Sequence, residues 1–499
     1  MAEAIPGEVD LLVVGGGING VGVARDAAGR GLATLLVERD DLAAATSQWS
    51  TKLIHGGLRY LEHYEFRLVG ESLAEREVLL AQAPHLIEPL AFVLPHEPHL
   101  RPAWMIRAGL FLYDRIGGRM TLPRSFGVDL DHTRWGAGLK HRFRKGFVYA
   151  DARVDDARLV VATAAAARNH GATVVTRTRF VRAARADGAW RATLADAGGE
   201  REVRAKAIVN VGGPWVADVL KSVPAAPTGA SVRHVKGSHI VVPRVHDEAH
   251  AYILQNADKR IVFVIPYHDR FSLIGTTDVP VTDYDRPAIS EQETDYLIEL
   301  ANAYLERPLS RRDVVWSYAG VRPLYDDGKS DPSSITRDYV LKVDAGERDA
   351  QAPVLSIYGG KLTTYRKLAE AALQALRPHF PAMKPAWTER DTLPGGDLPN
   401  RDRAAWIAEL GRRHPKLPGE LLRDLGRRHG ALATEVLGDA KTAADLGRDF
   451  GAGLTEREVD YFVRHEWAVT ADDVLWRRTK CGLGMDEAHR AALAAHLGG

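Results

Sequence analysis

The sequence contains only one cysteine, Cys481, among its 499 residues. No disulfide can form within the chain, and neither a cysteine-ligated iron–sulfur cluster nor a CxxC redox pair can be built from it. The nineteen histidines do not pair with acids or with this cysteine at the spacing of metal ligands, so we expect no metal site. Any electrons that the protein takes up therefore have to reside on an organic cofactor and leave to an external acceptor.

An excess of one charge and a long apolar run are also absent. The 66 basic and 65 acidic residues leave a formal net charge of +1, which gives no electrostatic reason to expect nucleic-acid binding. No basic segment followed by an apolar run precedes Asp10, and no apolar run approaches the length of a membrane span. We expect a cytoplasmic protein that is free or bound to a membrane surface.

The most informative stretch runs from Asp10 to Glu38. Residues 10–14 are a short apolar run typical of a buried parallel strand, and Gly15-Gly16-Gly17-Ile18-Asn19-Gly20 follows at once. A helix-compatible, alanine-rich segment and a second apolar strand at 34–37 come next, and the acid Glu38 ends the unit. This order favours a dinucleotide-binding βαβ unit over an ordinary βαβ unit with a glycine-rich turn.

Each part of this unit has a role in binding a dinucleotide. Gly15 permits the tight turn, Gly17 lets the backbone approach a pyrophosphate, and Gly20 lets helix and strand pack closely. The helix N-terminus offers unpaired N–H groups and the positive end of its dipole to the phosphates. Glu38 can accept hydrogen bonds from the adenosine ribose hydroxyls.

The residues after Glu38 distinguish flavin from nicotinamide. A nicotinamide enzyme normally continues into further βα units, whereas here small, hydroxyl-bearing and glycine residues at 40–57 lead into Leu58-Arg59-Tyr60-Leu61. Such a run suits a backbone that wraps a tightly held cofactor.

With this run, the sequence resembles the FAD-dependent glycerol-3-phosphate dehydrogenases, the respiratory, quinone-reducing type within the glycine- and D-amino-acid-oxidase-like flavoproteins. Two segments depart from that pattern, Gln48-Trp49 and Val211-Gly212-Gly213-Pro214, and both lie near the expected cofactor shell. The matching segments occur in order along essentially the whole chain: LIHGGLRYLEHYEF (53–66), PHLRPAWMI (98–106), KGSHIVV (236–242), ILQNADKRIVFVIP (253–266), IGTTD (274–278), GVRPL (320–324), ITRDY (335–339), GGKLTTYRKL (359–368) and WRRTK (476–480).

The resemblance and the sequence pattern together predict an α/β plus α+β fold. A Rossmann-like FAD-binding domain is interleaved with a mixed-sheet substrate domain, and a C-terminal helical domain follows. The expected limits are 1–83, 151–230 and 351–390 for the FAD-binding domain, 84–150 and 231–350 for the substrate domain, and 391–499 for the helical domain.

The resemblance also implies a reaction. FAD would oxidise sn-glycerol 3-phosphate to dihydroxyacetone phosphate and deliver the electrons to a membrane quinone. It further implies a homodimer bound to an anionic membrane surface, at the cytoplasmic face of the inner membrane. Two alternatives stay open: an oxidase that passes electrons to oxygen, releasing hydrogen peroxide, and a binding protein in which the flavin is structural.

A phosphorylated substrate needs cations, and arginine is preferred because its fork pairs two phosphate oxygens. The resemblance implies Arg322 and Arg337 as phosphate ligands, and Arg59 as a third; the alternative for each is a surface ion pair. Lys361 follows Gly359-Gly360 at a helix start, where its ammonium and the helix dipole can offset negative charge on a reduced flavin. A glycine turn capped by Thr363 or Thr364 is the alternative there.

Oxidation of the alcohol also needs a base, for which we favour His239 in the strand 237–242, since an imidazole accepts a proton near neutral pH. Its alternatives are a structural role for His239 and His55 as the base, although His55 beside Gly56-Gly57 suits a flavin contact. Thr276, Thr277 and Tyr60 resemble residues that line the substrate pocket.

The resemblance extends to the remaining cofactor contacts. The full set expected against FAD is Gly15, Gly17, Ile18, Asn19, Gly20, Glu38, Thr46, Ser47, Lys52, Leu53, Ile54, His55, Gly212, Gly213, Trp215, Gly360, Lys361, Leu362 and Thr363.

Two regions are left with open roles. The apolar patch 104–113 is accompanied by Arg101, Arg107 and Arg115 and is either a membrane-surface helix or a helix with its apolar face in the core. The segment after Pro399 has helical spacing and suits a cap, a dimer contact or a partner surface.

Overall fold

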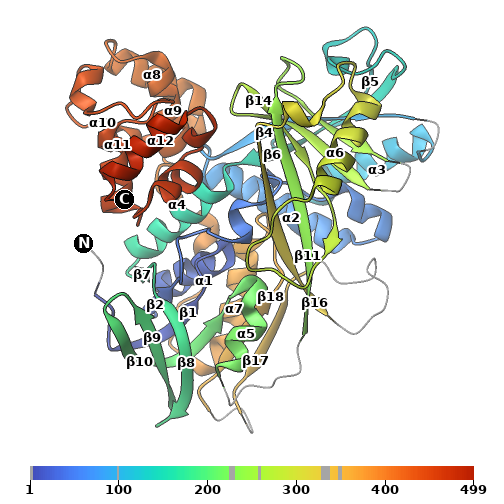
Figure 1. Ribbon diagram of the computed structural model, residues 1–499. Coiled ribbons are helices and arrows are strands. Elements are labelled where there is room, and N and C mark those ends of the chain that lie inside the picture. Colours follow the sequence, from blue (N-terminus) through green and yellow to red (C-terminus); the bar gives the residue numbers. More distant parts are fainter. Residues whose placement is uncertain are drawn as a thin grey trace.

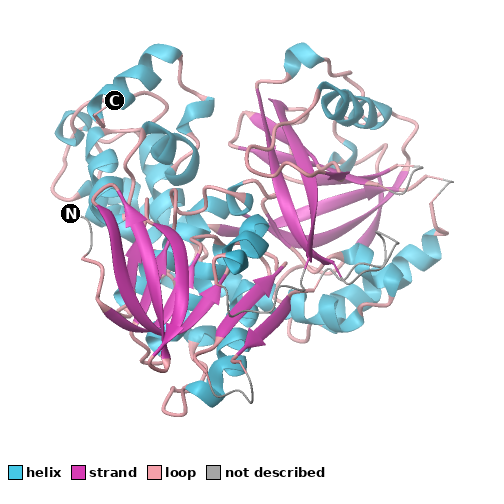
Figure 2. Ribbon diagram, turned by 60° about the horizontal axis from the view of Figure 1, so that its bottom comes forward, coloured by secondary structure: helices cyan, strands magenta, loops and turns pink. Residues whose placement is uncertain are grey.

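Two β-sheets and a separate group of helices form the protein (Figures 1 and 2). The computed structural model describes residues 4–97, 100–223, 231–256, 260–326, 338–346 and 351–498. None of the helices in these ranges has both the length and the apolar character that crossing a bilayer requires.

The first sheet, sheet A, contains the predicted dinucleotide unit. Its central strand β1 pairs in parallel with β2 and β10, because buried apolar runs without polar alternation suit a sheet covered on both faces. The strand order is β17-β18-β10-β1-β2-β7; β9 pairs antiparallel with β10, and β8 pairs antiparallel with β9. The strands are β1 (Glu8–Val14), β2 (Thr34–Val37), β7 (Thr173–Val175), β8 (Arg179–Ala186), β9 (Ala189–Asp196), β10 (Gly199–Asn210), β17 (Val340–Asp344) and β18 (Val354–Tyr358).

Helices cover one face of sheet A, and α5 with the β8–β9 hairpin covers the other. Leu11 and Val13 of β1 join the core beneath the helices, while Leu12 and Val14 point to the opposite core. α1 packs closely on α7, where a Cβ at Gly22 would lie 2.8 Å from the ring of Tyr365. The helices are α1 (Ile18–Gly29), α4 (Asp156–Asn169), α5 (Val216–Lys221) and α7 (Tyr365–Leu376).

The second sheet, sheet B, is mostly antiparallel and carries α6 on one face and α2 and α3 on the other. Among its described strands, β12 and β4 are the pair that runs in parallel. Its strands are β3 (Leu53–Ile54), β4 (Ile87–Pro95), β5 (Phe126–Asp129), β6 (Lys145–Val154), β11 (Ser231–Pro243), β12 (Ala251–Gln255), β13 (Ile261–Tyr267), β14 (Phe271–Gly275), β15 (Val279–Pro280) and β16 (Trp316–Asp326), and its helices are α2 (Phe66–Gln82), α3 (Ala103–Ile116) and α6 (Glu291–Tyr304).

The last hundred residues form the C-terminal helical unit, coloured orange to red in Figure 1. It has two small cores of its own, one around Leu410 and Leu425 and one around Phe450 and Phe462. A buried ion pair between Arg158 of α4 and Glu466 joins it to the sheet A unit. Its elements are α8 (Arg403–Arg413), α9 (Gly419–His429), α10 (Ala433–Leu437), α11 (Glu456–His465), a π-helical turn (Asp473–Arg478) and α12 (Glu487–His496).

The predicted fold class is confirmed: a Rossmann-like sheet and a mixed sheet alternate along the chain, and helices follow. The predicted domain limits remain a prediction. Strand pairing differs from them at two places, since β3 at 53–54 belongs to sheet B and β17 at 340–344 belongs to sheet A.

Candidate functional site

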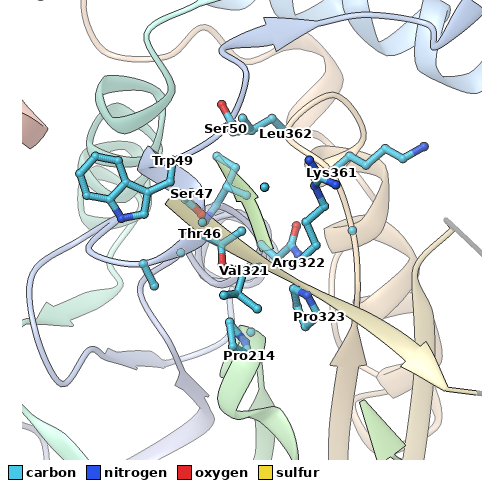
Figure 3. A pocket seen from close by; sticks show the side chains of 18 of the residues that line it. Thr46, Ser47, Trp49, Ser50, Pro214, Val321, Arg322, Pro323, Lys361 and Leu362 are labelled. Atoms are coloured by element: carbon cyan, nitrogen blue, oxygen red, sulfur yellow. Dashed lines mark hydrogen bonds between the residues drawn. The ribbon is translucent and has the colours of Figure 1, made fainter. Parts of the chain in front are cut away.

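A cavity of about 1240 Å³ is lined by residues of both sheets (Figure 3). The glycine turn after β1, the segment after β2 and the turn before α7 contribute to it from sheet A. β11, β12, β13 and β16 contribute from sheet B, together with Thr276 just after β14. One continuous space therefore connects the predicted dinucleotide unit with the predicted substrate residues.

The glycine turn has the geometry that a pyrophosphate site requires. Gly15 has a φ of +119°, and a Cβ there would lie 2.5 Å from the carbonyl oxygen of Val211. A Cβ at Gly17 would meet only the Ser47 hydroxyl within 4 Å, so this backbone is open to a ligand. Gly20 lies outside the cavity lining and packs on Gly15, where a Cβ would lie 1.9 Å from the carbonyl oxygen.

Glu38 is fixed by backbone donors at the end of β2. Its carboxylate accepts hydrogen bonds from the N–H of Gly16 at 2.6 Å and of Asp40 at 2.9 Å. Burial raises the pKa of Glu38 above its usual value, although both N–H bonds act in the opposite direction. The carboxylate lines the cavity beside the glycine turn, at the place where a Rossmann unit holds a ribose.

Residues 40–52, here called the cofactor loop, tie the two sheets together. The Ser47 hydroxyl accepts a hydrogen bond from the N–H of Ile18 at 3.0 Å, and the Thr46 hydroxyl donates to the carbonyl of Val321 on β16 at 2.6 Å. The Lys52 ammonium bonds both carboxylate oxygens of Asp156, at 2.8 and 2.9 Å. Lys52 is buried outside the cavity lining and anchors the end of this loop.

His239 lies in the wall of the cavity on β11, 1% exposed. Its Nε2 is 3.0 Å from the Thr51 hydroxyl, and its ring stacks on Tyr318 with 4.7 Å between centroids. Burial, with Arg322 and Lys52 nearby, holds the pKa of His239 well below its usual value. The imidazole therefore stays in the neutral form, which is the form that a general base needs.

Arg322 projects from β16 over Gly237, where a Cβ would lie 2.5 Å from Nη2. Its Nη2 donates to the Thr276 hydroxyl at 3.3 Å, and its Nη1 forms an ion pair with Asp278. The side chain is 37% exposed, so an anion from solvent can reach the guanidinium.

Lys361 stands in the turn before α7. Its ammonium lies 4.2 Å from the centroid of the Tyr60 ring and has no hydrogen-bond partner among the described residues, although it is buried. Thr364, the residue at the start of α7, makes no side-chain cap, and the Thr363 hydroxyl bonds the backbone of His55 instead. The cation is therefore available to a ligand in the cavity.

Several buried polar atoms in the cavity wall suit a large polar cofactor. Asn19 donates through Nδ2 to the carbonyl of Gly359, but its Oδ1 is buried without a partner among the described residues. The same holds for Nδ1 of His239 and Nζ of Lys361. Because buried polar groups are normally paired, these atoms, the open glycine turn and Glu38 together fit FAD.

Most of the other predicted site residues line this cavity, and the side-chain roles assigned to them remain predictions. His55 is half-buried, and burial lowers its pKa. Ile54 and Thr277 are outside the lining; the Thr277 hydroxyl donates instead to Glu293 at 2.8 Å. Arg337 lies outside the described residues. The lining includes Arg59, Tyr60, Leu53, His55, Gly212, Gly213, Trp215, Gly360, Leu362, Thr363 and Thr276.

The structure adds three residues to the predicted set: Thr51, Tyr318 and Asp278, which contact His239 or Arg322. Asp278 ends the IGTTD segment, but no local pattern marks Thr51 or Tyr318. Trp49, which departs from the family pattern, packs on Gly320 and stacks on Tyr318 at 5.3 Å between centroids. In the part of the chain that is described, no group of three or more His, Cys, Asp and Glu residues is arranged to hold a metal ion.

Comparison with known proteins agrees with this geometry. Residues 10–366 match the family described as FAD dependent oxidoreductase, and residues 386–496 match the C-terminal domain of alpha-glycerophosphate oxidase. The glycerol-3-phosphate dehydrogenase of Pseudomonas aeruginosa is 52% identical over 490 residues, which are 98% of this chain and 94% of that protein.

Two further proteins are similar over nearly their whole length. The D-erythritol 1-phosphate dehydrogenase of Brucella abortus is 50% identical over 495 residues, 99% of this chain and 98% of that protein. The X-ray structure of the glycerol-3-phosphate dehydrogenase from Bacillus halodurans complexed with FAD is 25% identical, with a TM-score of 0.74, and covers 98% of this chain and 94% of that one. The chain is therefore an enzyme of the FAD-dependent oxidoreductase family with FAD as its cofactor, and it belongs with the glycerol-3-phosphate dehydrogenases of that family.

Proposed function

We propose that the protein oxidises sn-glycerol 3-phosphate to dihydroxyacetone phosphate and passes the electrons to a membrane quinone. One observation carries this proposal: a solvent-accessible arginine, Arg322, and a buried neutral imidazole, His239, lie in the same wall of the FAD cavity. An anion-binding group beside a proton acceptor is what a phosphorylated alcohol needs. The identity of 52% to a glycerol-3-phosphate dehydrogenase supports the choice of substrate.

The phosphate is bound by Arg322 in this proposal, with Thr276 as a second donor. The Arg322 guanidinium donates to Asp278 and to Thr276 in the absence of substrate, so the phosphate has to replace Asp278 as the acceptor of one of these hydrogen bonds. Asp278 is 51% exposed, and water can solvate its carboxylate when this happens. Arg59 and Tyr60 line the same cavity and contribute further contacts, while Arg337 is proposed from the family resemblance.

His239 removes the proton from the C2 hydroxyl. Its neutral form is maintained by burial and by the neighbouring cations, and stacking on Tyr318 together with the Thr51 hydroxyl fixes its ring. The bound FAD supplies the acceptor for the hydride from C2. The buried ammonium of Lys361 offsets negative charge that develops in the cavity. His55, whose backbone is bonded to Thr363, contacts the cofactor and does not act as the base.

The helix α3 supplies the membrane contact in this proposal. Its inner face buries Leu110 and Tyr113, whereas Trp104 is 70% and Phe111 54% exposed. Arg101, Arg107, Arg115 and Arg119 are exposed in and around this helix. An exposed apolar stripe flanked by arginines suits an anionic lipid surface, and the buried face of the same helix leaves this stripe free to meet it. The protein then lies as a homodimer on the cytoplasmic face of the inner membrane.

An anaerobic titration of the purified holoenzyme with glycerol 3-phosphate tests the reaction. We expect the yellow flavin band to bleach with one equivalent of substrate. D-erythritol 1-phosphate is titrated in parallel, because a relative of 50% identity is named for it. A band that bleaches with the tetritol phosphate alone, or with neither compound, would remove glycerol 3-phosphate as the substrate.

The acceptor is tested by comparing quinone reduction with peroxide release during turnover. The matched C-terminal domain is named for an oxidase, whereas the relatives from Pseudomonas aeruginosa and Brucella abortus are named dehydrogenases. We expect quinone reduction without stoichiometric peroxide. Release of one peroxide per substrate oxidised would show that oxygen, and not a quinone, is the electron acceptor.

The membrane contact is tested by vesicle flotation of the parent and of the double variant Trp104→Ser/Phe111→Ser. We expect the parent to float with anionic vesicles and the variant to remain in the unbound fraction. Equal flotation of the two proteins would exclude α3 as the membrane contact.

A further inference from the structure

A segment of the C-terminal helical unit packs behind the wall of the cavity, against the cofactor loop and β16. It is Trp476-Arg477-Arg478-Thr479-Lys480, here called the strut, a motif that the proposed reaction does not use. Both carboxylate oxygens of Asp41, in the cofactor loop, are bonded by Arg478 at 2.7 Å each. Arg477 adds a further bond to the same carboxylate through its Nε.

This contact is shielded from water. The side chains of Asp41 and Arg478 are both 0% exposed, so salt screens their attraction little. The remaining donors of Arg478 bond the carbonyl of Glu466, with Nε at 2.9 Å, which fixes the guanidinium in one orientation. Removing either partner would leave a buried charge without its counterion and would strongly destabilise the contact between the two units.

Asp41 in turn fixes the part of the cofactor loop that lies on the glycine turn. Its carbonyl accepts a hydrogen bond from the N–H of Ala44 at 3.1 Å, and the N–H of Ala43 donates to the carbonyl of Gly16 at 3.1 Å. Ala43 and Ala44 line the cavity next to Glu38. Any shift of Asp41 therefore moves the backbone that surrounds the dinucleotide site.

The strut also touches the other side of the cavity. The indole of Trp476 stacks on Trp316 at the start of β16, with 4.7 Å between centroids and 8° between planes. Trp316 in turn lies 5.9 Å from Trp49, and both of these side chains line the cavity. One short segment of the C-terminal unit thus supports the wall from both sheets.

We propose that the strut residues Trp476, Arg477 and Arg478 are positioning residues of the FAD site. The C-terminal helical unit holds the cofactor loop in the shape that lines the cavity, and FAD in turn stabilises the docking of this unit, since a coupling between two sites is reciprocal. The inference concerns the cofactor alone and does not depend on the substrate proposed above.

The test measures FAD release from the diluted full-length holoenzyme by the rise of free-flavin fluorescence. We expect Arg478→Gln and Arg477→Gln to release FAD at least roughly tenfold faster than the parent, within the range of typical couplings. The matched control is Arg464→Gln, which removes an exposed ion pair with Asp460 in the same unit. Its release rate should equal that of the parent.

A second measurement separates positioning from folding. Far-UV circular dichroism identifies the variants that remain folded, and Arg477→Gln, which leaves the Asp41–Arg478 pair intact, is the milder change. In the parent protein, FAD should slow hydrogen exchange in residues 473–480. Folded Arg477→Gln with the parent's release rate, or an exchange rate in residues 473–480 that FAD does not change, would overturn the inference.

Discussion

The two parts of the cavity are built differently. The dinucleotide part comes mainly from one continuous stretch, and its polar groups pair with each other, as Gly16 N–H does with Glu38 and Ile18 N–H with Ser47. The catalytic part combines residues from separate strands and leaves Nδ1 of His239 and Nζ of Lys361 buried without hydrogen-bond partners in the described ranges. Apart from Oδ1 of Asn19, which is also buried without a partner in the described ranges, the first part holds its shape through its own hydrogen bonds, whereas the second keeps polar groups for a ligand.

The largest effect is expected in the dinucleotide part, where backbone packing leaves no room. In Gly20→Ala the new Cβ would lie 1.9 Å from the carbonyl oxygen of Gly15, so the turn and helix α1 must separate. We expect colourless, inactive protein, measured as the ratio of flavin to protein absorbance. Gly109→Ala is the control because nothing lies within 4 Å of its Cβ. A normally yellow Gly20→Ala protein would show that this packing is not needed.

The next largest effect is expected at His239. His239→Gln removes the proton acceptor but keeps a polar side chain of similar size, so turnover should fall by about 10²- to 10⁴-fold while FAD content stays unchanged. Stopped-flow measurement of flavin reduction gives the rate. The pKa of His239 lies well below its usual value, so the neutral base persists as pH falls through 6.5. The parent's rate should therefore hold through neutral pH and fall only at lower pH; a variant with the same rate and profile would remove His239 as the base.

Arg322 should affect substrate affinity more than the chemical step. Arg322→Ala loses charge-assisted hydrogen bonds to phosphate, which are worth about 1.5–3 kcal/mol, so KM should rise by about 10- to 100-fold. Arg322→Lys keeps the positive charge but loses the two-pronged guanidinium, so its KM should lie between those of the parent and of Arg322→Ala. Steady-state kinetics separates KM from kcat. An unchanged KM in Arg322→Ala would place the phosphate elsewhere.

The smallest effects are expected at two adjacent threonines, Thr276 and Thr277, whose substitution should change different properties. Thr276 contacts Arg322, whereas the Thr277 hydroxyl donates to Glu293. Burial alone would raise the pKa of Glu293, but Lys236 and the hydroxyl and backbone donors around the carboxylate lower it to about 2. Thr276→Val should raise KM a few-fold. Thr277→Val should leave KM unchanged and lower the free energy of unfolding by about 1–3 kcal/mol, because a buried carboxylate loses a donor. The opposite assignment of the two effects would contradict the geometry.

Sequence was sufficient for the dinucleotide part because its signals are local. The expected strand, turn, helix and strand between Asp10 and Glu38 match β1, α1 and β2. The hydrophobic periodicity of a buried strand or an amphipathic helix is visible in consecutive residues, so these elements can be predicted without knowing any tertiary contact.

Side-chain directions in the catalytic part are decided by residues far away in the chain. Lys52 was predicted to contact FAD, but its ammonium bonds Asp156, which lies 104 positions away. Thr277 and Thr276 are neighbours in the turn after β14, and their hydroxyls bond different partners, Glu293 of α6 and Arg322 of β16. The contact of Thr51 with His239 spans 188 positions and has no local signature.

In the proposed reaction, Arg322 recognises the phosphate while His239 takes the proton from the neighbouring alcohol. The most direct measurement is the anaerobic rate of flavin reduction by glycerol 3-phosphate and by glycerol, at equal concentration below saturation, in the parent and in Arg322→Ala. We expect the parent to prefer the phosphorylated substrate strongly, and this preference to fall by about 10- to 100-fold in the variant. An equal preference in both proteins would contradict this proposal.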